Sequence, residues 1–204
     1  MDAVLARAGA FFLGKSPVQL AAEEIARRLE AAGIDYAVAG AFSLGYHGFE
    51  RTTEDVDILI TVEGLARFKA EWLGRGYVNL RAGDKPVRDT FNNVRINFLL
   101  AGELPGDGKP KPVAIPIPKE AAESGERFRV VTLPRLIELK LASGLSAPHR
   151  ARDLVDIQDL IHRAKLPKEL IEPTTRQKPK EATAKAPRRQ EIQELGVLAP
   201  WRFT

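Results

Sequence analysis

Two aspartates stand one residue apart at the start of the apolar run DVDILI, at positions 55 and 57. If the run is a β-strand, their side chains lie on one face with Cα atoms about 6.5–7 Å apart. Two carboxylates this close disfavour joint ionisation unless a cation lies between them, and oxygen ligands with room for water and phosphate suit Mg²⁺. Asp55 and Asp57 therefore predict half of a metal site. The alternative is a pair of solvated residues at a strand start, paired with Arg51.

Residues upstream of this pair are suited to holding a phosphate. Gly40 follows a short apolar segment, expected to be a buried strand, and leads into an expected short helix or turn. A glycine there lets an anion approach the N–H groups at the helix start, although it is also ordinary turn chemistry. Ser43 offers a hydroxyl, and Arg51 and Thr53 are placed to orient the carboxylates or contact phosphate.

The elements that must position these residues follow in the order helix, strand, short helix, strand, helix, strands and two helices. In the clearest helix Ser16 is a natural N-cap, Pro17 fits the first helical position, and Gln19 can close a capping box. The expected strands lie within 35–40, 55–60 and 88–102, where the last stretch forms one or two strands, and short extended segments are expected at 113–118 and 128–132. The expected helices lie within 16–33, 62–76, 132–144 and 151–165.

This order predicts an α/β (α+β) fold in which helices flank a mixed β-sheet core. We expect this mixed α/β core at 1–132 and a helical C-terminal part at 133–167 packed on it. A basic tail rich in Pro and Lys follows at 168–204. The tail has too few apolar residues to offset the entropy of ordering, so we expect it to be flexible.

Composition is that of an ordinary soluble protein. The 204 residues are 44% hydrophobic and 28% charged, and a formal net charge of +4 fits an anionic partner such as a nucleotide or RNA. The absence of cysteine excludes a disulfide framework and a thiolate metal site, and it suits a reducing cytoplasm. No apolar run approaches the roughly 18–20 residues of a membrane span. We therefore expect a cytoplasmic protein without membrane contact.

The segment 39–60, AGAFSLGYHGFERTTEDVDILI, resembles the signature of the nucleotidyltransferase fold, the DNA-polymerase-β-like superfamily, as its minimal bacterial members carry it. Ala41 replaces the usual second Gly or Ser. Two later segments, 130–144 and 149–160, resemble the helical end of a bacterial group that includes the AbiEii-like toxins of toxin–antitoxin systems. The matching positions are Gly40, Ser43, His47, Gly48, Arg51, Thr53, Asp55 and Asp57 in the first segment, and Lys140, Arg152, Asp153 and Asp156 in the later two.

The resemblance implies a nucleotidyltransferase that depends on Mg²⁺ (or Mn²⁺). Asp55 and Asp57 would hold the metal, which bridges the triphosphate of an NTP, while Gly40 and Ser43 would cradle the β- and γ-phosphates. A hydroxyl of an RNA end, a protein or a small molecule would attack the α-phosphate, and pyrophosphate would leave. Lys140 would reach the triphosphate, unless it is a solvated residue on an amphipathic helix. A cognate antitoxin would be a further partner.

The chain departs from the superfamily at its third carboxylate, which commonly acts as base toward the acceptor hydroxyl and as a second metal ligand. The matching residue is Asn97. Asparagine cannot accept a proton at neutral pH and is a poor ligand for a second Mg²⁺. Asp89 is a substitute if its hairpin folds it inward. Two outcomes are open. The protein still catalyses transfer, and substrate or water takes the proton of the acceptor hydroxyl, or it is a catalytically impaired member that binds nucleotide or RNA as a regulator.

Other residues of the resemblance have structural interpretations. His47 is expected to brace the turn that precedes the aspartates. Asp153 and Asp156 are one helical turn apart and share a face, so they are expected to pair with Lys140 or Arg152.

A third hypothesis concerns the tail at 168–204, which ends in the apolar stretch VLAPWRFT. An interaction protein would use this tail to bind a partner. The alternative is a solubilising linker, because Lys and Arg are spread among Pro and Glu.

Overall fold

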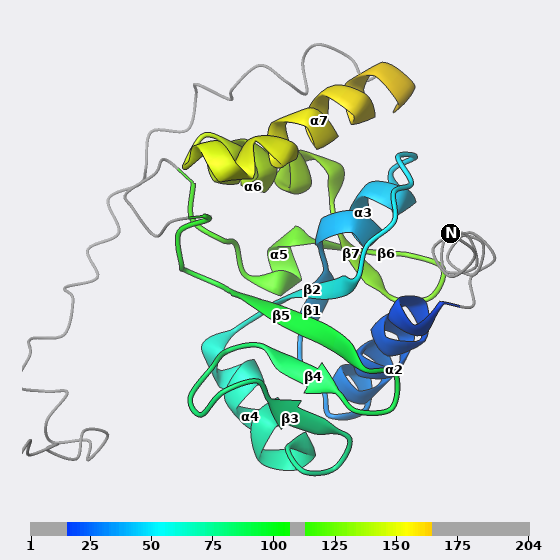
Figure 1. The fold of residues 1–204 in the computed structure, drawn as a ribbon, viewed down its shortest axis with the longest axis vertical. Coiled ribbons are helices and arrows are strands. Elements are labelled where there is room, and N and C mark those ends of the chain that lie inside the picture. Colours follow the sequence, from blue (N-terminus) through cyan, green and yellow to red (C-terminus); the bar gives the residue numbers. More distant parts are fainter. Residues whose placement is uncertain (1–15, 107–112, 165–204) are drawn as a thin grey trace, which may run out of the picture. The chain divides into compact units, whose positions relative to one another are not determined.

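A mixed β-sheet of seven strands organises the residues that the computed structural model describes, 16–106 and 113–164 (Figure 1). The strands are β1 (Tyr36–Val38), β2 (Asp55–Ile60), β3 (Tyr77–Asn79), β4 (Val87–Asp89), β5 (Val94–Leu100), β6 (Ala122–Ser124) and β7 (Arg129–Val131). Their order in the sheet is β3-β4-β5-β2-β1-β7-β6. β2 runs parallel to β5 and β1 runs parallel to β7, whereas the other neighbouring pairs are antiparallel. The predicted mixed α/β fold is confirmed.

Helices cover both faces of this sheet. They are α2 (Pro17–Ala31), α3 (Gly40–Tyr46), α4 (Val62–Trp72), α5 (Pro118–Ala121), α6 (Leu133–Gly144), the 3-10 helix η1 (Pro148–Arg150) and α7 (Ala151–Ala164). Figure 1 shows α2 and α4 on one side of the sheet and α3, α6 and α7 on the other. No helix in the described part of the chain is both long and apolar enough to cross a membrane.

Strand alternation divides the apolar residues into two cores. Val56, Ile58 and Ile60 of β2 point to the side of α2 and α4, where they join one buried cluster. Leu59 points the other way and joins a second cluster with residues of α6 and α7. Asp55 and Asp57 alternate in step with Leu59 along β2, so all three lie on the face that α3, α6 and α7 cover.

Local sequence signals account for the ends of α2. The predicted capping box is present: the Gln19 backbone N–H donates to Ser16 Oγ (3.2 Å) and the Ser16 N–H donates to Gln19 Oε1 (3.1 Å). Such a cap contributes about 1 kcal/mol. Pro17 occupies the first helical turn, and Gly33, with φ +61°, lies just beyond the end.

Close packing joins the last two helices. A side chain at Gly144 of α6 would approach Leu154 of α7 to 2.7 Å, so only glycine leaves the room that Leu154 occupies. Both helices lie within the predicted helical part at 133–167. The tail predicted at 168–204, and with it the interaction hypothesis, lies outside the described residues.

Candidate active site

The two predicted aspartates meet the predicted third position at the junction of β2 and β5. The parallel register places Asp57 opposite Asn97. Asn97 Nδ2 donates hydrogen bonds to Asp55 Oδ2 (2.9 Å) and to Asp57 Oδ1 (3.1 Å). Asp57 and Asn97 are 40 residues apart in the sequence. The fold nevertheless brings the three side chains into one cluster.

Neighbouring groups fix which way the Asn97 amide points. Arg95 Nε donates to Asn97 Oδ1 at 2.8 Å. The reverse orientation would turn the amide oxygen toward two carboxylates and its NH₂ toward a guanidinium, and both contacts are repulsive. Asn97 therefore presents N–H donors, and not an acceptor, to the acidic pair.

Gly40 makes room for the second aspartate. Its φ is +62°, a left-handed conformation that favours glycine. A Cβ at this position would lie 2.1 Å from Asp57 Oδ2, which no side chain tolerates. The adjacent backbone N–H of Ala39 donates to the Asp57 carbonyl oxygen at 2.8 Å. The structure thus gives Gly40 a role in admitting the carboxylate, and its contact with phosphate stays a prediction.

The first aspartate is held from the preceding loop. Thr53 Oγ1 donates to Asp55 Oδ1 at 2.8 Å. The other carboxylate oxygen of Asp55 accepts from Asn97. Thr53 therefore orients the Asp55 carboxylate, as expected. Its contact with a nucleotide stays a prediction.

The electrostatic balance at Asp57 is unfavourable to its ionised form. Desolvation by burial raises the pKa of Asp57, and the negative charge of Asp55 raises it further. The hydrogen bond from Asn97 and the positive charges of Lys140 and Arg51 act in the opposite direction without cancelling the rise. The pair is therefore short of positive charge.

Lys140 is buried in an ion-pair network and not solvated. Its Nζ donates to Asp153 Oδ1 (2.9 Å) and Asp156 Oδ2 (2.8 Å), and both Lys140 and Asp156 are buried. The expected pairing of the two α7 aspartates with Lys140 is thereby confirmed, and Arg152 Nε also lies 3.5 Å from Asp156 Oδ1. Contact of Lys140 with a triphosphate stays a prediction, because its hydrogen bonds here go to α7.

Arg51 joins this network to the loop that leads into β2. Its Nε lies 3.2 Å from Asp156 Oδ1. The angle between them is unsuited to a hydrogen bond, so both buried atoms lack a hydrogen-bond partner among the described residues. Arg51 thus pairs with Asp156 of α7. The alternative in which Arg51 pairs with Asp55 and Asp57 is therefore wrong.

The short helix α3 is anchored to β7 by two polar side chains. Ser43 Oγ donates to the Val131 carbonyl oxygen (2.9 Å), and His47 Nε2 contacts the same oxygen at 2.8 Å. Ser43 has no exposed surface. His47 therefore braces the turn as expected, whereas the predicted phosphate contact of Ser43 stays a prediction and would require this hydroxyl to become accessible.

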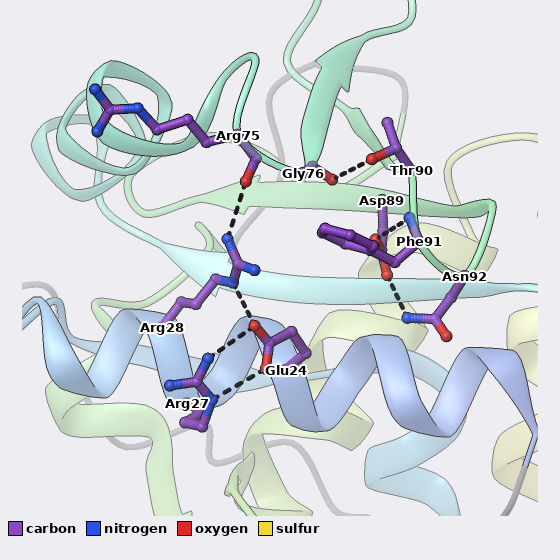
Figure 2. A network of polar contacts seen from close by, with 9 residues as sticks. All are labelled: Glu24, Arg27, Arg28, Arg75, Gly76, Asp89, Thr90, Phe91 and Asn92. Atoms are coloured by element: carbon purple, nitrogen blue, oxygen red, sulfur yellow. Dashed lines mark hydrogen bonds and ion pairs between the residues drawn. The ribbon is translucent and has the colours of Figure 1, made fainter.

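Asp89 does not substitute for the third carboxylate. In the antiparallel pair of β4 and β5 it lies opposite Val94, which belongs to the core beneath α2 and α4. Directly opposite residues share a face, so Asp89 lies on the other side of the sheet from Asp57. It is buried there and accepts hydrogen bonds from the Phe91 N–H (2.9 Å) and Asn92 Nδ2 (2.7 Å), as Figure 2 shows.

A cavity of about 570 Å³ opens beside the site, between α2, α3 and the turn that joins β6 to β7. Phe42 and Phe128 form part of its lining and meet edge to face, with ring centroids 5.9 Å apart. Tyr46 and Arg51 also line it, whereas the two aspartates do not. Arg51 therefore lies between this cavity and the α7 network.

Comparison with known proteins gives a likeness at the level of the fold. No protein-family model and no curated protein matches the sequence. The solution structure of the antibiotic-resistance factor ANT(2'')-Ia aligns over 76% of this chain and 86% of its own, with a TM-score of 0.52 and 11% identity. The described chain shares the nucleotidyltransferase fold of that protein.

Two further structures align more loosely. A crystal structure of ANT(2'')-Ia in complex with adenylyl-2''-tobramycin covers 74% of this chain and 93% of its own, with a TM-score of 0.47 and 10% identity. An antigenic nucleotidyltransferase-like protein from Paracoccidioides brasiliensis covers 69% and 73%, with a TM-score of 0.39 and 17% identity.

Proposed function

We propose that the protein is a nucleotidyltransferase that moves NMP from an NTP to a hydroxyl acceptor. One observation carries the proposal: Asp55 and Asp57 share one amide from Asn97 and stand against a glycine whose Cβ would collide with Asp57. Two carboxylates held together in this way, in a nucleotidyltransferase fold, need a cation to ionise jointly.

The residues present fit a single hard cation. No group of three or more His, Cys, Asp and Glu side chains in the described part of the chain is arranged to hold a metal. Mg²⁺, however, is commonly bound by one or two carboxylates together with waters and substrate phosphates. Asp55 and Asp57 would hold Mg²⁺ or Mn²⁺ in that way, and the bound ion would neutralise charge on the phosphates. The shift in the pKa of Asp57 supports this need for positive charge.

The reaction asks the chain mainly for positioning. The acceptor oxygen forms a bond to the α-phosphorus while the bond from that phosphorus to the bridging oxygen breaks, and pyrophosphate leaves with the electron pair. Asn97 cannot take the acceptor proton, so the proton passes to water or to a substrate oxygen. Thr53 and Asn97 hold the carboxylates in place before substrate binds, and such preorganisation lowers the barrier without covalent chemistry.

Labelled nucleotides test the proposal. The full chain is incubated with Mg²⁺, each labelled NTP, and cell extract as the source of RNA, protein and small-molecule acceptors. We expect one fraction to become labelled with the native protein and not with Asp57→Ala. Asp35→Asn, a change at an exposed carboxylate, is the matched control and should label as the native protein does. Equal labelling by Asp57→Ala contradicts the proposal.

A second candidate function rests on Asn97. An amide in place of a carboxylate fits a catalytically impaired protein that binds nucleotide or RNA as a regulator. Tight binding of Mg²⁺–NTP without turnover, measured on the same preparation, favours this function. Transfer by the native chain excludes it.

The resemblance to AbiEii-like toxins extends the first proposal to a toxin–antitoxin system. Induced expression of an active toxin would arrest growth, and a cognate antitoxin would relieve the arrest. Arrest by the native chain but not by Asp57→Ala supports this role, and normal growth in both cases contradicts it.

A further inference from the structure

Two arginines extend the candidate site across the open part of the sheet. The strand registers place Arg95 of β5 beside Asp55 and place Arg88 of β4 directly opposite Arg95. Residues paired in this way share a face, so both arginines lie on the side of the carboxylate pair. Val78 of β3, opposite Arg88, is 43% exposed, and Arg95 is exposed as well. The sheet beyond β5 is therefore open to solvent on this face.

The two arginines form an unfavourable pair that no carboxylate of the described residues compensates. Like charges directly opposite each other on neighbouring strands are destabilising. Within residues 16–106 and 113–162, no carboxylate lies within 4.0 Å of either guanidinium. Two facing arginines do not stabilise the pairing of β4 and β5. A bound anion would relieve the repulsion between them.

Each guanidinium is held by hydrogen bonds to a single asparagine and keeps donors for a ligand. Arg88 Nη1 donates to Asn93 Oδ1 at 2.9 Å and to the Asn93 carbonyl oxygen at 3.3 Å, and Asn93 adopts a left-handed φ of 56° in the β4–β5 turn. Arg95 Nε donates to Asn97 Oδ1 at 2.8 Å. A guanidinium carries five N–H donors, so these contacts hold each group in place and leave most of its donors unused among the described residues.

The other basic residues near the carboxylates differ in this respect. Lys140 and Arg51 flank the pair from the side of α6 and α7, but Asp153 and Asp156 already compensate them. On the other flank, Arg88 and Arg95 carry positive charge that no ion pair within the described part of the chain compensates. Planar guanidinium groups bind phosphate through two parallel hydrogen bonds, which identifies the chemistry of the ligand.

We propose that Arg88 and Arg95 form a binding site for a phosphate group of a substrate, on the open face of β4 and β5 beside Asp55. The phosphate belongs either to the triphosphate of the nucleotide or to a phosphate on the acceptor. This assignment deepens the proposed function and rests on it for the identity of the substrates. The site itself is defined by the arginines and does not require the metal.

Thermal unfolding of the full chain with inorganic tripolyphosphate tests the site without metal or catalysis. Because a ligand that binds the folded state raises Tm, the native protein should show a rise that saturates with concentration. Arg88→Gln should weaken this binding by roughly tenfold, the worth of a charge-assisted hydrogen bond. Arg88 is the sharper variant, because Arg95 also orients Asn97. Arg81→Gln, a change at an exposed arginine after β3, is the matched control and should respond as the native protein does.

The ligand-free Tm separates a binding role from a structural one. Removing one of two facing positive charges should leave the Tm of Arg88→Gln unchanged or higher. A lower Tm together with an unchanged response to tripolyphosphate would overturn the proposal, as would equal responses from the native chain, Arg88→Gln and Arg81→Gln.

Two more probes identify the source of the phosphate. If Arg88→Gln weakens binding of Mg²⁺–ATP, the site takes the nucleotide's triphosphate. If it weakens only binding of a single-stranded trinucleotide, the site takes a phosphate of the acceptor. Unchanged binding of both probes would count against the site. Failure of the native chain to transfer NMP contradicts the proposed function but leaves the tripolyphosphate result standing, so the two failures are distinguishable.

Discussion

Charged side chains gather on both faces of the sheet, and the two groups are balanced in opposite ways. On the face of α2, Arg28 Nε donates to Glu24 Oε1 (2.6 Å) and Arg28 Nη1 donates to the Arg75 carbonyl oxygen (3.2 Å), as Figure 2 shows. The guanidinium also lies 4.2 Å from the centre of the Trp72 ring. On the other face, Asp55 and Asp57 share the donors of one neutral amide.

The difference separates structural charge from functional charge. The buried cation Arg28 meets a carboxylate, a carbonyl oxygen and an aromatic face, so its charge stabilises the fold. The two acids share one neutral amide, and the nearby charges of Lys140 and Arg51 do not cancel the rise that burial causes in the pKa of Asp57. Stability is lost at such a pair unless a ligand restores the balance, which is typical of functional sites.

The largest expected effect is at Asp57. Asp57→Asn should lower nucleotidyl transfer on the order of 10³-fold, because it removes one charge from the cation site. The free energy of unfolding should stay the same or rise, since the repulsion with Asp55 disappears. Initial rates and chemical denaturation measure both. If Asp57→Asn is less stable and fully active, the cluster is structural and not functional.

Gly40 is important for stability because its missing side chain leaves room for Asp57. Gly40→Ala should cost about 1–2 kcal/mol for its left-handed backbone and about 1–3 kcal/mol more for the contact with Asp57. Gly33→Ala, also with positive φ but with nothing within 4 Å of its Cβ, should show the backbone cost alone. Urea denaturation of both variants gives the difference.

The same comparison in a second background isolates the contact. When Asp57→Ala is already present, Gly40→Ala should lose most of its excess over Gly33→Ala, because only the 3.3 Å contact with the Cβ at position 57 remains. A persistent excess would mean that Gly40 is required for another reason.

Restoring the third carboxylate should make stability depend on metal. Asn97→Asp removes the donor that both acids share, and we expect it to cost about 2 kcal/mol without divalent cations. Mg²⁺ or Mn²⁺ should recover that loss and raise transfer above the native rate. Tm with and without metal measures the first expectation. Asn79→Asp, the same change at an exposed position, controls for added charge and should show no metal dependence.

The smallest expected change in function is on the α2 face. Arg28→Ala should lower the free energy of unfolding by about 2 kcal/mol, through lost packing and hydrogen bonds. Transfer by the folded fraction should not change. A loss of activity at constant stability would show that the two faces are coupled.

The sequence was sufficient where local rules decide the structure. The capping box of α2 follows from side-chain chemistry, and the shared face of Asp55 and Asp57 follows from the period of a strand. The place of Asn97 beside them came from a resemblance, and the strand register bears it out. The three-residue strands β3 and β6 were not predicted, because so few residues carry no periodic signal.

Contacts between distant segments could not be predicted. Whether Asp89 faced the acids depended on the register of β4 on β5, and a shift of one residue would have reversed its face. The burial of Lys140 with Asp156 depended on how α6 packs against α7. The collision that Gly40 avoids involves Asp57, which lies 17 positions away on β2, and no local pattern encodes it.

We infer that the acids at 55 and 57 coexist because a divalent cation joins them when a nucleotide binds. Mn²⁺ titration of the full chain, followed by electron paramagnetic resonance with and without ATP, tests it directly. We predict one tightly bound Mn²⁺ per chain in the presence of ATP, and loss of that ion in Asp57→Asn. Equal Mn²⁺ binding by the native chain and Asp57→Asn, or no binding by either, would contradict the account.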